Sequence, residues 1–168
     1  TGGEPLLFPA VAALSQRLRD AGHFITVETA GTVWLDDLAC DLISISPKLA
    51  HSTPHGRAPE WVARHEAARW APDVVDRLIG AFDAFQLKFV VRWRDPAELR
   101  LDLAEIDAML EALSTEFDDP TRVLLMPECT DRDELHIAYE RLRPICTERD
   151  FRLGERLHIH VFGHQLGT

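Results

Sequence analysis

The chain opens on TGGEP, a short segment whose residue types could bind a ligand. The glycine pair puts little bulk in the way of an approaching molecule and permits backbone angles that other residues avoid. Glu4 adds a carboxylate, and Pro5 suits the first position of a helix, where its missing N–H costs nothing. The segment is therefore predicted to be a loop that can approach a ligand closely before it opens a helix.

Three further segments place polar residues directly after apolar, β-branched runs. ETAGT follows the run that begins at His23, SISPK follows the run that begins at Asp41, and MPE follows the run that begins at Arg122. Active sites of parallel α/β folds gather at the carboxyl ends of strands, so these segments are expected to lie together. Each is weak evidence alone, because small polar residues often only cap helices.

The elements that must position these segments alternate between strand and helix. Apolar, β-branched runs predict strands at 23–29, 41–47, 85–92, 122–128 and 156–162. Helical spacing of apolar residues predicts helices at 5–18, 60–82, 95–113 and 130–150, the second one kinked or divided at Pro72. This alternation predicts an α/β fold with a parallel sheet, right-handed crossovers and outer helices.

Composition narrows the possible classes of protein. The 168 residues, 46% of them apolar, fit a single domain over 1–168, and the formal net charge of -10 argues against a nucleic-acid surface. With no apolar run of about 18 residues, no membrane span is predicted, and a cytoplasmic protein with a small-molecule or protein partner is expected. The three cysteines have no CxxC spacing, which favours reduced thiols and predicts no metal site.

The order of the polar segments resembles the radical S-adenosylmethionine superfamily and, within it, the 7-carboxy-7-deazaguanine synthases. The similarity covers nearly the whole chain and is carried by TGGEPLL, GHFITVETAGT, CDLISISPKLA and VLLMPE. It implies a partial (β/α) barrel that lacks its first strands. It also implies a radical lyase reaction, the ring contraction of 6-carboxytetrahydropterin to 7-carboxy-7-deazaguanine with loss of ammonia.

The same resemblance assigns binding roles residue by residue, with no catalytic residue among them. The glycine-glycine-glutamate loop would take the amino group of S-adenosylmethionine, ETAGT and SISPK would surround its ribose and carboxylate, and MPE would lie near its adenine. The implied cofactor-binding residues are Gly2, Gly3, Glu4, Glu28, Thr29, Ser44, Ser46, Lys48, Met126, Pro127 and Glu128. Thr32 is assigned to the substrate, and His158 and His160 are added to it from their place on the last predicted strand.

The resemblance further implies a 4Fe–4S cluster, Mg²⁺ near the substrate carboxylate, an external electron donor and a homodimer. The family's CxxxCxxC loop is absent here, and Cys40, Cys129 and Cys146 cannot reproduce its spacing. The chain is therefore expected to be a truncated portion whose cluster ligands lie upstream. Loss of the first strands would expose a sheet edge and apolar surface, through which the chain would dimerise or aggregate.

Near the end of the chain, His158, His160 and His164 form an H-x-H-x3-H pattern that could suit zinc. On a strand, His158 and His160 would point to one side. No acidic or thiol partner stands at ligand spacing, so these side chains are expected to line the substrate pocket or to face solvent.

Two other functions stay open. A different radical S-adenosylmethionine enzyme, such as the activating enzyme of a glycyl-radical protein, would have an open barrel mouth in place of a small pocket. A relative without a cluster would serve as a binding subunit, and a CxxxCxxC loop in the unprocessed gene product would exclude it.

Overall fold

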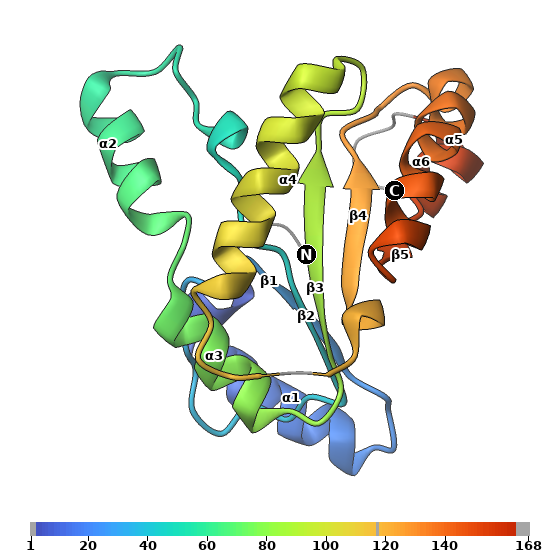
Figure 1. Cartoon of the computed structure of the whole chain (residues 1–168). Helices are drawn as coiled ribbons and strands as arrows, with labels where there is room; N and C mark the ends of the chain where they lie inside the picture. Colours follow the sequence, from blue (N-terminus) through green and yellow to red (C-terminus); the bar gives the residue numbers. More distant parts are fainter. Residues whose placement is uncertain (1–2, 117, 164–168) are drawn as a thin grey trace.

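A computed structural model describes residues 3–116 and 118–163 and shows one parallel sheet with helices on its outer side (Figure 1). The five strands lie side by side in chain order, and every neighbouring pair is parallel. They are β1 (Thr26–Thr29), β2 (Leu42–Ile45), β3 (Phe85–Val91), β4 (Val123–Pro127) and β5 (Arg152–Leu153). Because all strands run the same way, their carboxyl ends meet at one edge of the sheet, as the sequence predicted.

The crossovers between strands carry the helices. These are α1 (Ala10–Asp20), α2 (Pro59–Ala68), α3 (Pro72–Ala81), α4 (Pro96–Glu111), α5 (Arg132–Glu148) and α6 (Leu157–Phe162). Three short 3-10 turns, η1 (Pro5–Leu7), η2 (Ala50–Ser52) and η3 (Pro120–Arg122), complete the elements. Helix α4 packs on β3 and α5 packs on β4 and β5, while α2 projects at the upper left of Figure 1. None of the helices in the described ranges is long and apolar enough to cross a membrane.

The two faces of the sheet differ in chemistry. Along β3, Phe85, Leu87, Phe89 and Val91 are buried, whereas the alternate residues are only partly covered. The buried apolar residues of the strands face the outer helices and form the core with apolar side chains of α3, α4 and α5. The opposite face carries Glu28, Ser44, Gln86 and Lys88 on β1–β3 and Met126 on β4. This face is the polar, inner side of the partial barrel.

The predicted strand at 156–162 is wrong, because these residues form helix α6. The place beside β4 is taken by Arg152–Leu153, and the backbone N–H of Gly154 donates to the carbonyl of Leu125 at 2.8 Å. Of the apolar residues in α6, only Ile159 is buried, and Leu157 and Val161 are 62% and 58% exposed. The alternating apolar residues that suggested a strand are therefore not part of the sheet, and two of them are exposed on α6.

The first helix also differs from its prediction. Pro5 begins the short turn η1, and α1 starts only at Ala10, with Pro9 between them. Proline has no N–H to donate to a preceding carbonyl, so Pro9 cannot continue a helix that began at Pro5. Pro72 divides the predicted helix at 60–82 in the same way, into α2 and α3.

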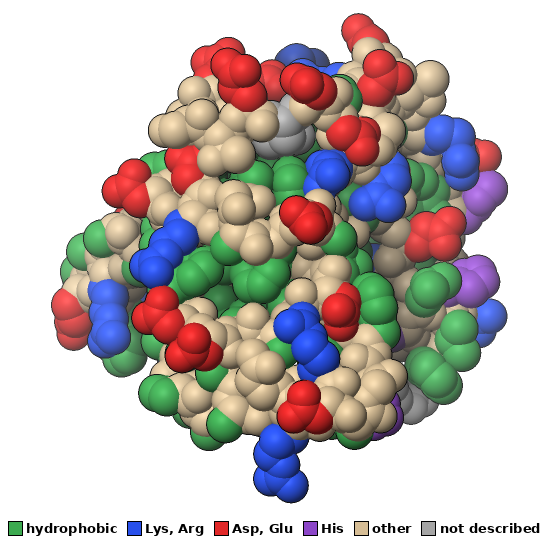
Figure 2. Space-filling view, turned by 90° about the horizontal axis from the view of Figure 1, so that it is seen from below, with side chains coloured by type: hydrophobic (Ala, Val, Ile, Leu, Met, Phe, Trp, Pro, Cys, Tyr) green, Lys and Arg blue, Asp and Glu red, His purple; other side chains and the backbone are tan. Residues whose placement is uncertain are grey.

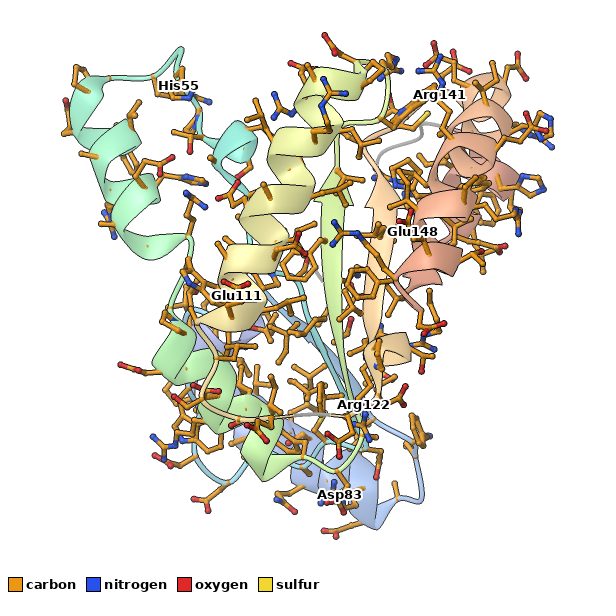
Figure 3. All side chains as sticks on the ribbon, in the orientation of Figure 1. His55, Asp83, Glu111, Arg122, Arg141 and Glu148 are labelled. Atoms are coloured by element: carbon orange, nitrogen blue, oxygen red, sulfur yellow. The ribbon has the colours of Figure 1, made fainter. Side chains whose placement is uncertain are left out.

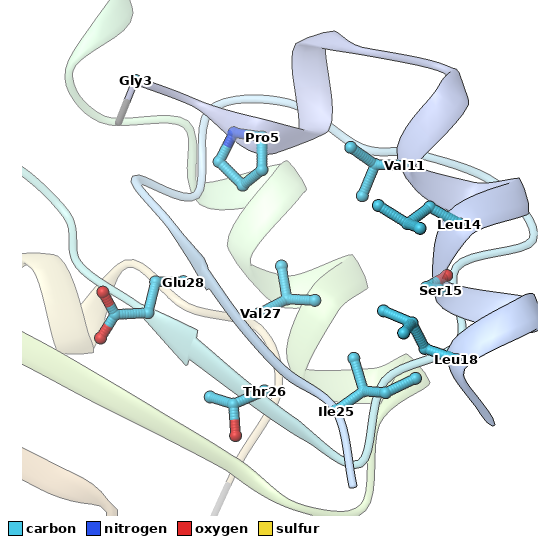
Figure 4. Close-up of a pocket in the computed structure, with 10 residues that line it drawn as sticks. All are labelled: Gly3, Pro5, Val11, Leu14, Ser15, Leu18, Ile25, Thr26, Val27 and Glu28. Atoms are coloured by element: carbon cyan, nitrogen blue, oxygen red, sulfur yellow. The ribbon is translucent and has the colours of Figure 1, made fainter. Parts of the chain in front are cut away.

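Strand β1 lies at the edge of the sheet, and among the described residues β2 is the only strand that pairs with it. Beside that edge lies an apolar hollow of about 380 Å³, lined in part by Val11, Leu14 and Leu18 of α1 and by Ile25 (Figure 4). Seen from below, apolar side chains lie open between charged ones (Figure 2). Leu14 is 54% exposed, so α1 is not covered on this side. Association through this surface stays a prediction.

Candidate functional site

A hollow of about 680 Å³ lies at the carboxyl ends of the strands, on the polar face of the sheet. Volumes of a few hundred to about 1,000 Å³ are typical of small-molecule sites. Residues from all four segments singled out in the sequence line it: Gly3, Glu4, Glu28, Thr29, Ser46, Lys48 and Met126. The structure therefore brings the loop at the start of the chain together with the ends of β1, β2 and β4.

Glu4 joins the first loop to the end of β1. Its Oε1 accepts hydrogen bonds from the Thr29 hydroxyl at 2.8 Å and from the backbone N–H of Leu6 at 3.2 Å, and its Oε2 accepts one from the N–H of Ala30 at 2.7 Å. A carboxylate offers about four lone-pair sites, so acceptor capacity remains for a ligand. Gly3 precedes it with φ of 76°, a conformation that favours glycine.

The turn after β1 depends on Gly31. Its φ is 74°, and a Cβ atom there would lie 2.7 Å from Cγ2 of Ile45. The N–H of Gly31 donates to the Thr29 hydroxyl at 3.0 Å. Thr29 is buried and engaged with both Gly31 and Glu4, so its hydroxyl orders the turn and the carboxylate beside the hollow.

Both lysines of the chain, Lys48 and Lys88, line this hollow, while the other 16 basic residues are arginines. The Lys88 ammonium lies 2.9 Å from Oε1 of Glu28. Lys48 reaches solvent, but the protein atoms crowded around it, followed by the nearby Lys88 charge, lower its pKa. Lys88 is thus engaged by Glu28, and the Lys48 ammonium is the lysine group that can bind an anionic group such as a carboxylate here.

Replacing Lys88 with methionine is expected to raise the pKa of Lys48. The change removes a positive charge that disfavours the protonated Lys48 ammonium, and it releases Glu28, which favours that ammonium. Carboxylate binding at Lys48 would then persist to higher pH, because it is lost as the pH rises through the Lys48 pKa. A pH titration of lysine ε-carbon NMR signals measures the change, and an unmoved Lys48 midpoint would contradict it.

The two serines of SISPK have different surroundings. Ser46 lines the hollow, and its N–H donates to the Thr29 carbonyl at 2.7 Å. Ser44 is fully buried, and its hydroxyl accepts a hydrogen bond from Gln86 Nε2 at 2.9 Å. Gln86 in turn accepts from Arg152 at 3.2 Å. Ser44 is thus part of a polar chain across the sheet and does not line the hollow.

The MPE segment contributes only Met126 to the lining of the hollow. Pro127 is buried as the last residue of β4, and its carbonyl accepts from Arg156 Nη1 at 3.3 Å. Glu128 is exposed, and its carbonyl accepts from the Trp93 indole N–H at 3.1 Å. Thr32, in the turn after β1, also lies outside the lining.

The predicted common face of His158 and His160 is wrong, because both lie on helix α6. His158 lines the 680 Å³ hollow. His160 lines a separate hollow of about 320 Å³ with His136 and Tyr139 of α5. Gly2 and His164 fall outside the described residues.

Six lining residues were not predicted as site residues from the sequence: Ala30, Lys88, Val90, Glu155, Arg156 and Leu157. Lys88 and Val90 could have been found from the alternation of β3, which puts both on the face opposite the core. Arg156 could not, because its segment was predicted to be a strand. Its backbone N–H donates to the Tyr139 hydroxyl at 2.7 Å, which fixes the segment before α6.

The described residues do not fit a metal cluster. Among residues 3–116 and 118–163, no group of three or more His, Cys, Asp or Glu side chains could hold a metal ion. The three thiols are buried on separate elements, and burial raises the pKa of Cys40 and of Cys146. Cys40 and Cys146 are therefore poor thiolate ligands, and the described residues offer no set of ligands for a 4Fe–4S cluster.

Comparison with known proteins identifies relatives of the chain. It is 39% identical over 170 residues to 7-carboxy-7-deazaguanine synthase of Rhodopirellula baltica and 40% identical over 172 residues to that of Halobacterium salinarum, covering 100% and 96% of this chain. It spans 62% and 63% of those two proteins. The crystal structure of QueE from Escherichia coli matches with a TM-score of 0.58 and 21% identity, over 91% of this chain and 52% of that chain. No protein-family model matches.

The parallel sheet with outer helices is the fold of that solved structure. Fold and sequence together make the chain homologous to part of a radical S-adenosylmethionine enzyme. The particular homologue is 7-carboxy-7-deazaguanine synthase, and the chain aligns with about three fifths of the length of the two synthases compared.

Proposed function

We propose that the chain forms the ligand-binding part of a 7-carboxy-7-deazaguanine synthase, which converts 6-carboxytetrahydropterin to 7-carboxy-7-deazaguanine. The observation that carries the proposal is the convergence of TGGEP, ETAGT, SISPK and MPE on one hollow of about 680 Å³. The identity of 39–40% to two such synthases supports the same substrate. A homodimer, Mg²⁺ and an external electron donor belong to the proposal for the whole enzyme.

Binding of S-adenosylmethionine at this hollow uses three groups of the chain. The ammonium of its methionine part would be accepted by the Glu4 carboxylate, which is already aligned by Thr29 and Ala30. Its carboxylate would pair with the Lys48 ammonium, because a lysine presents a compact positive charge with three donors. Met126 and Val90 would give an apolar wall that excludes water.

The other side of the hollow would receive the pterin. Arg156 and His158 line that side together with Glu155, and they can bind polar groups of a small heterocycle. When bound in the complete enzyme, the cluster and S-adenosylmethionine supply the radical that starts the reaction. In this proposal, the described residues bind, orient and shield the two small molecules.

Calorimetric titration of the 168-residue chain with S-adenosylmethionine tests the proposal. Saturable binding that is lost in Lys48→Met supports it, and added 6-carboxytetrahydropterin should bind to the same protein. A glycyl-radical activating enzyme would bind S-adenosylmethionine but not the pterin. Absence of both binding events would overturn the proposed function.

A further inference from the structure

The loop that follows β2 is held by side chains from distant parts of the chain. The carbonyl of Lys48 accepts a hydrogen bond from Arg69 Nη1 at 3.0 Å. The N–H of Ala50 donates to both carboxylate oxygens of Glu105, at 3.1 and 3.0 Å. His51 Nδ1 lies 3.2 Å from Oδ1 of Asp102. Three of four consecutive residues are thus fixed from outside their own loop.

The groups that hold the loop also hold each other. Arg69 Nη1 lies 2.5 Å from Oε1 of Glu105, and Arg69 Nε lies 2.8 Å from Glu66. The side chains of Arg69 and Glu105 are 16% and 23% exposed, so solvent screens this pair less than a surface pair. Hydrogen bonds with an ionised partner are about twice as strong as neutral ones. Helix α4 and the end of α2 therefore act as one clamp.

The clamp acts on the backbone that carries Lys48. With the Lys48 carbonyl and the Ala50 N–H both hydrogen-bonded, motion of the loop backbone is restricted, and the ammonium moves mainly through its own side-chain torsions. Pro47, buried beside Lys48, restricts the loop further. Neither Arg69 nor Glu105 lines the hollow, so their effect on a ligand must pass through the loop.

We propose that Glu105 and Arg69 are positioning residues that hold Lys48 ready for the carboxylate of the ligand. The ligand part of this proposal rests on the proposed function, in which that carboxylate belongs to S-adenosylmethionine. Positioning reduces the conformational freedom lost on binding, which raises affinity without any new contact. The clamp is independent of the apolar hollow beside β1 and of the buried thiols.

The two lysines make the test direct, because lysine labelled with ¹³C at the ε carbon gives only two signals in this chain. Lys88→Arg assigns them. Glu105→Ala removes both acceptors of Ala50 and one of the two carboxylate partners of Arg69, whereas Glu105→Gln keeps one acceptor oxygen. Glu111→Ala is the matched control, since Glu111 is an exposed glutamate at the end of the same helix (Figure 3).

In Glu105→Ala, the Lys48 signal is expected to shift, exchange of the Ala50 amide hydrogen to accelerate about tenfold, and S-adenosylmethionine to bind about tenfold more weakly. Glu105→Gln should lie between this variant and the wild type, while Glu111→Ala should match the wild type and the Lys88 signal should stay in place. Unchanged Ala50 exchange and an unmoved Lys48 signal in folded Glu105→Ala and Glu105→Gln would overturn the clamp.

The two proposals fail in different ways. If the wild type does not bind S-adenosylmethionine, the proposed function fails. The exchange rate of the Ala50 amide and the position of the Lys48 signal in Glu105→Ala still show whether Glu105 holds the loop. If the wild type binds and Glu105→Ala loosens the loop without weakening binding, the loop is clamped but Lys48 is not positioned for the ligand, and the further inference fails alone.

Discussion

Replacing Asp102 with alanine is expected to lower the free energy of unfolding by about 3 kcal/mol. The Asp102 side chain is 2% exposed and accepts hydrogen bonds from the Arg92 N–H at 2.8 Å and from Arg92 Nη2 at 2.6 Å. It also contacts His51. Alanine would leave the Arg92 N–H without its acceptor and a partly buried guanidinium without its main counter-charge, both of which are costly.

Glu98→Ala is the control for this prediction. Glu98 binds the same guanidinium, with Arg92 Nη1 at 3.0 Å, but its side chain is 46% exposed. Exposed ion pairs contribute about 0–1 kcal/mol, so Glu98→Ala should change stability little. Urea unfolding with a constant m-value compares the two variants. Equal losses of unfolding free energy in the two variants would show that burial of Asp102 does not strengthen its contacts.

The parts of the fold that could be predicted have strong local signals. Strand β3 alternates buried and partly covered residues over Phe85–Val91, and every buried position in it is apolar. Helix α4 begins at Pro96, one residue inside the predicted range, and Asp95 caps it because its side chain accepts from the Ala97 N–H at 2.7 Å. Such signals depend on a few neighbouring residues, so no knowledge of the tertiary structure is needed.

The errors come from segments whose structure is decided by distant partners. The residues at 156–162 alternate like a strand, yet the sheet position beside β4 is occupied by Arg152–Leu153. Periodicity cannot tell which of two neighbouring segments pairs with β4. At the other end of the chain, Pro9 prevents a continuous helix, and this could have been predicted from its missing N–H.

The candidate site was predicted through the order of its segments, not through the geometry of any one of them. The sequence put Glu28 at the end of one predicted strand and Lys48 directly after the next, the family resemblance put Glu4 beside them, and all three line the hollow. It could not indicate that the Ser44 hydroxyl accepts a hydrogen bond from Gln86. Nor could it indicate that Glu105 accepts one from the N–H of Ala50, 55 residues away in the sequence. Those contacts depend on how helices pack across the sheet, which spacing alone does not encode.

Replacing Glu4 with glutamine is expected to have the largest effect on ligand binding. A glutamine has only one acceptor oxygen. Its NH₂ group, which is a donor, would therefore lie opposite one of the two donors that Glu4 now accepts from, the Ala30 N–H or the Thr29 hydroxyl. The variant also loses the negative charge proposed to accept the ammonium of S-adenosylmethionine. A hydrogen bond to a charged group contributes about 1.5–3 kcal/mol, which corresponds to a weakening of binding of about 10- to 150-fold.

Thr29→Val separates the alignment of Glu4 from its charge. Valine keeps the carboxylate of Glu4 but removes the hydroxyl that donates to it at 2.8 Å and that accepts from the Gly31 N–H at 3.0 Å. Calorimetry should show weaker binding in Thr29→Val than in the wild type, and weaker binding still in Glu4→Gln. If Glu4→Gln melts at a lower temperature but binds S-adenosylmethionine like the wild type, Glu4 only connects the first loop to β1. Its carboxylate would then have no part in holding the ligand, and the ammonium would have to bind the carbonyls of the glycine loop.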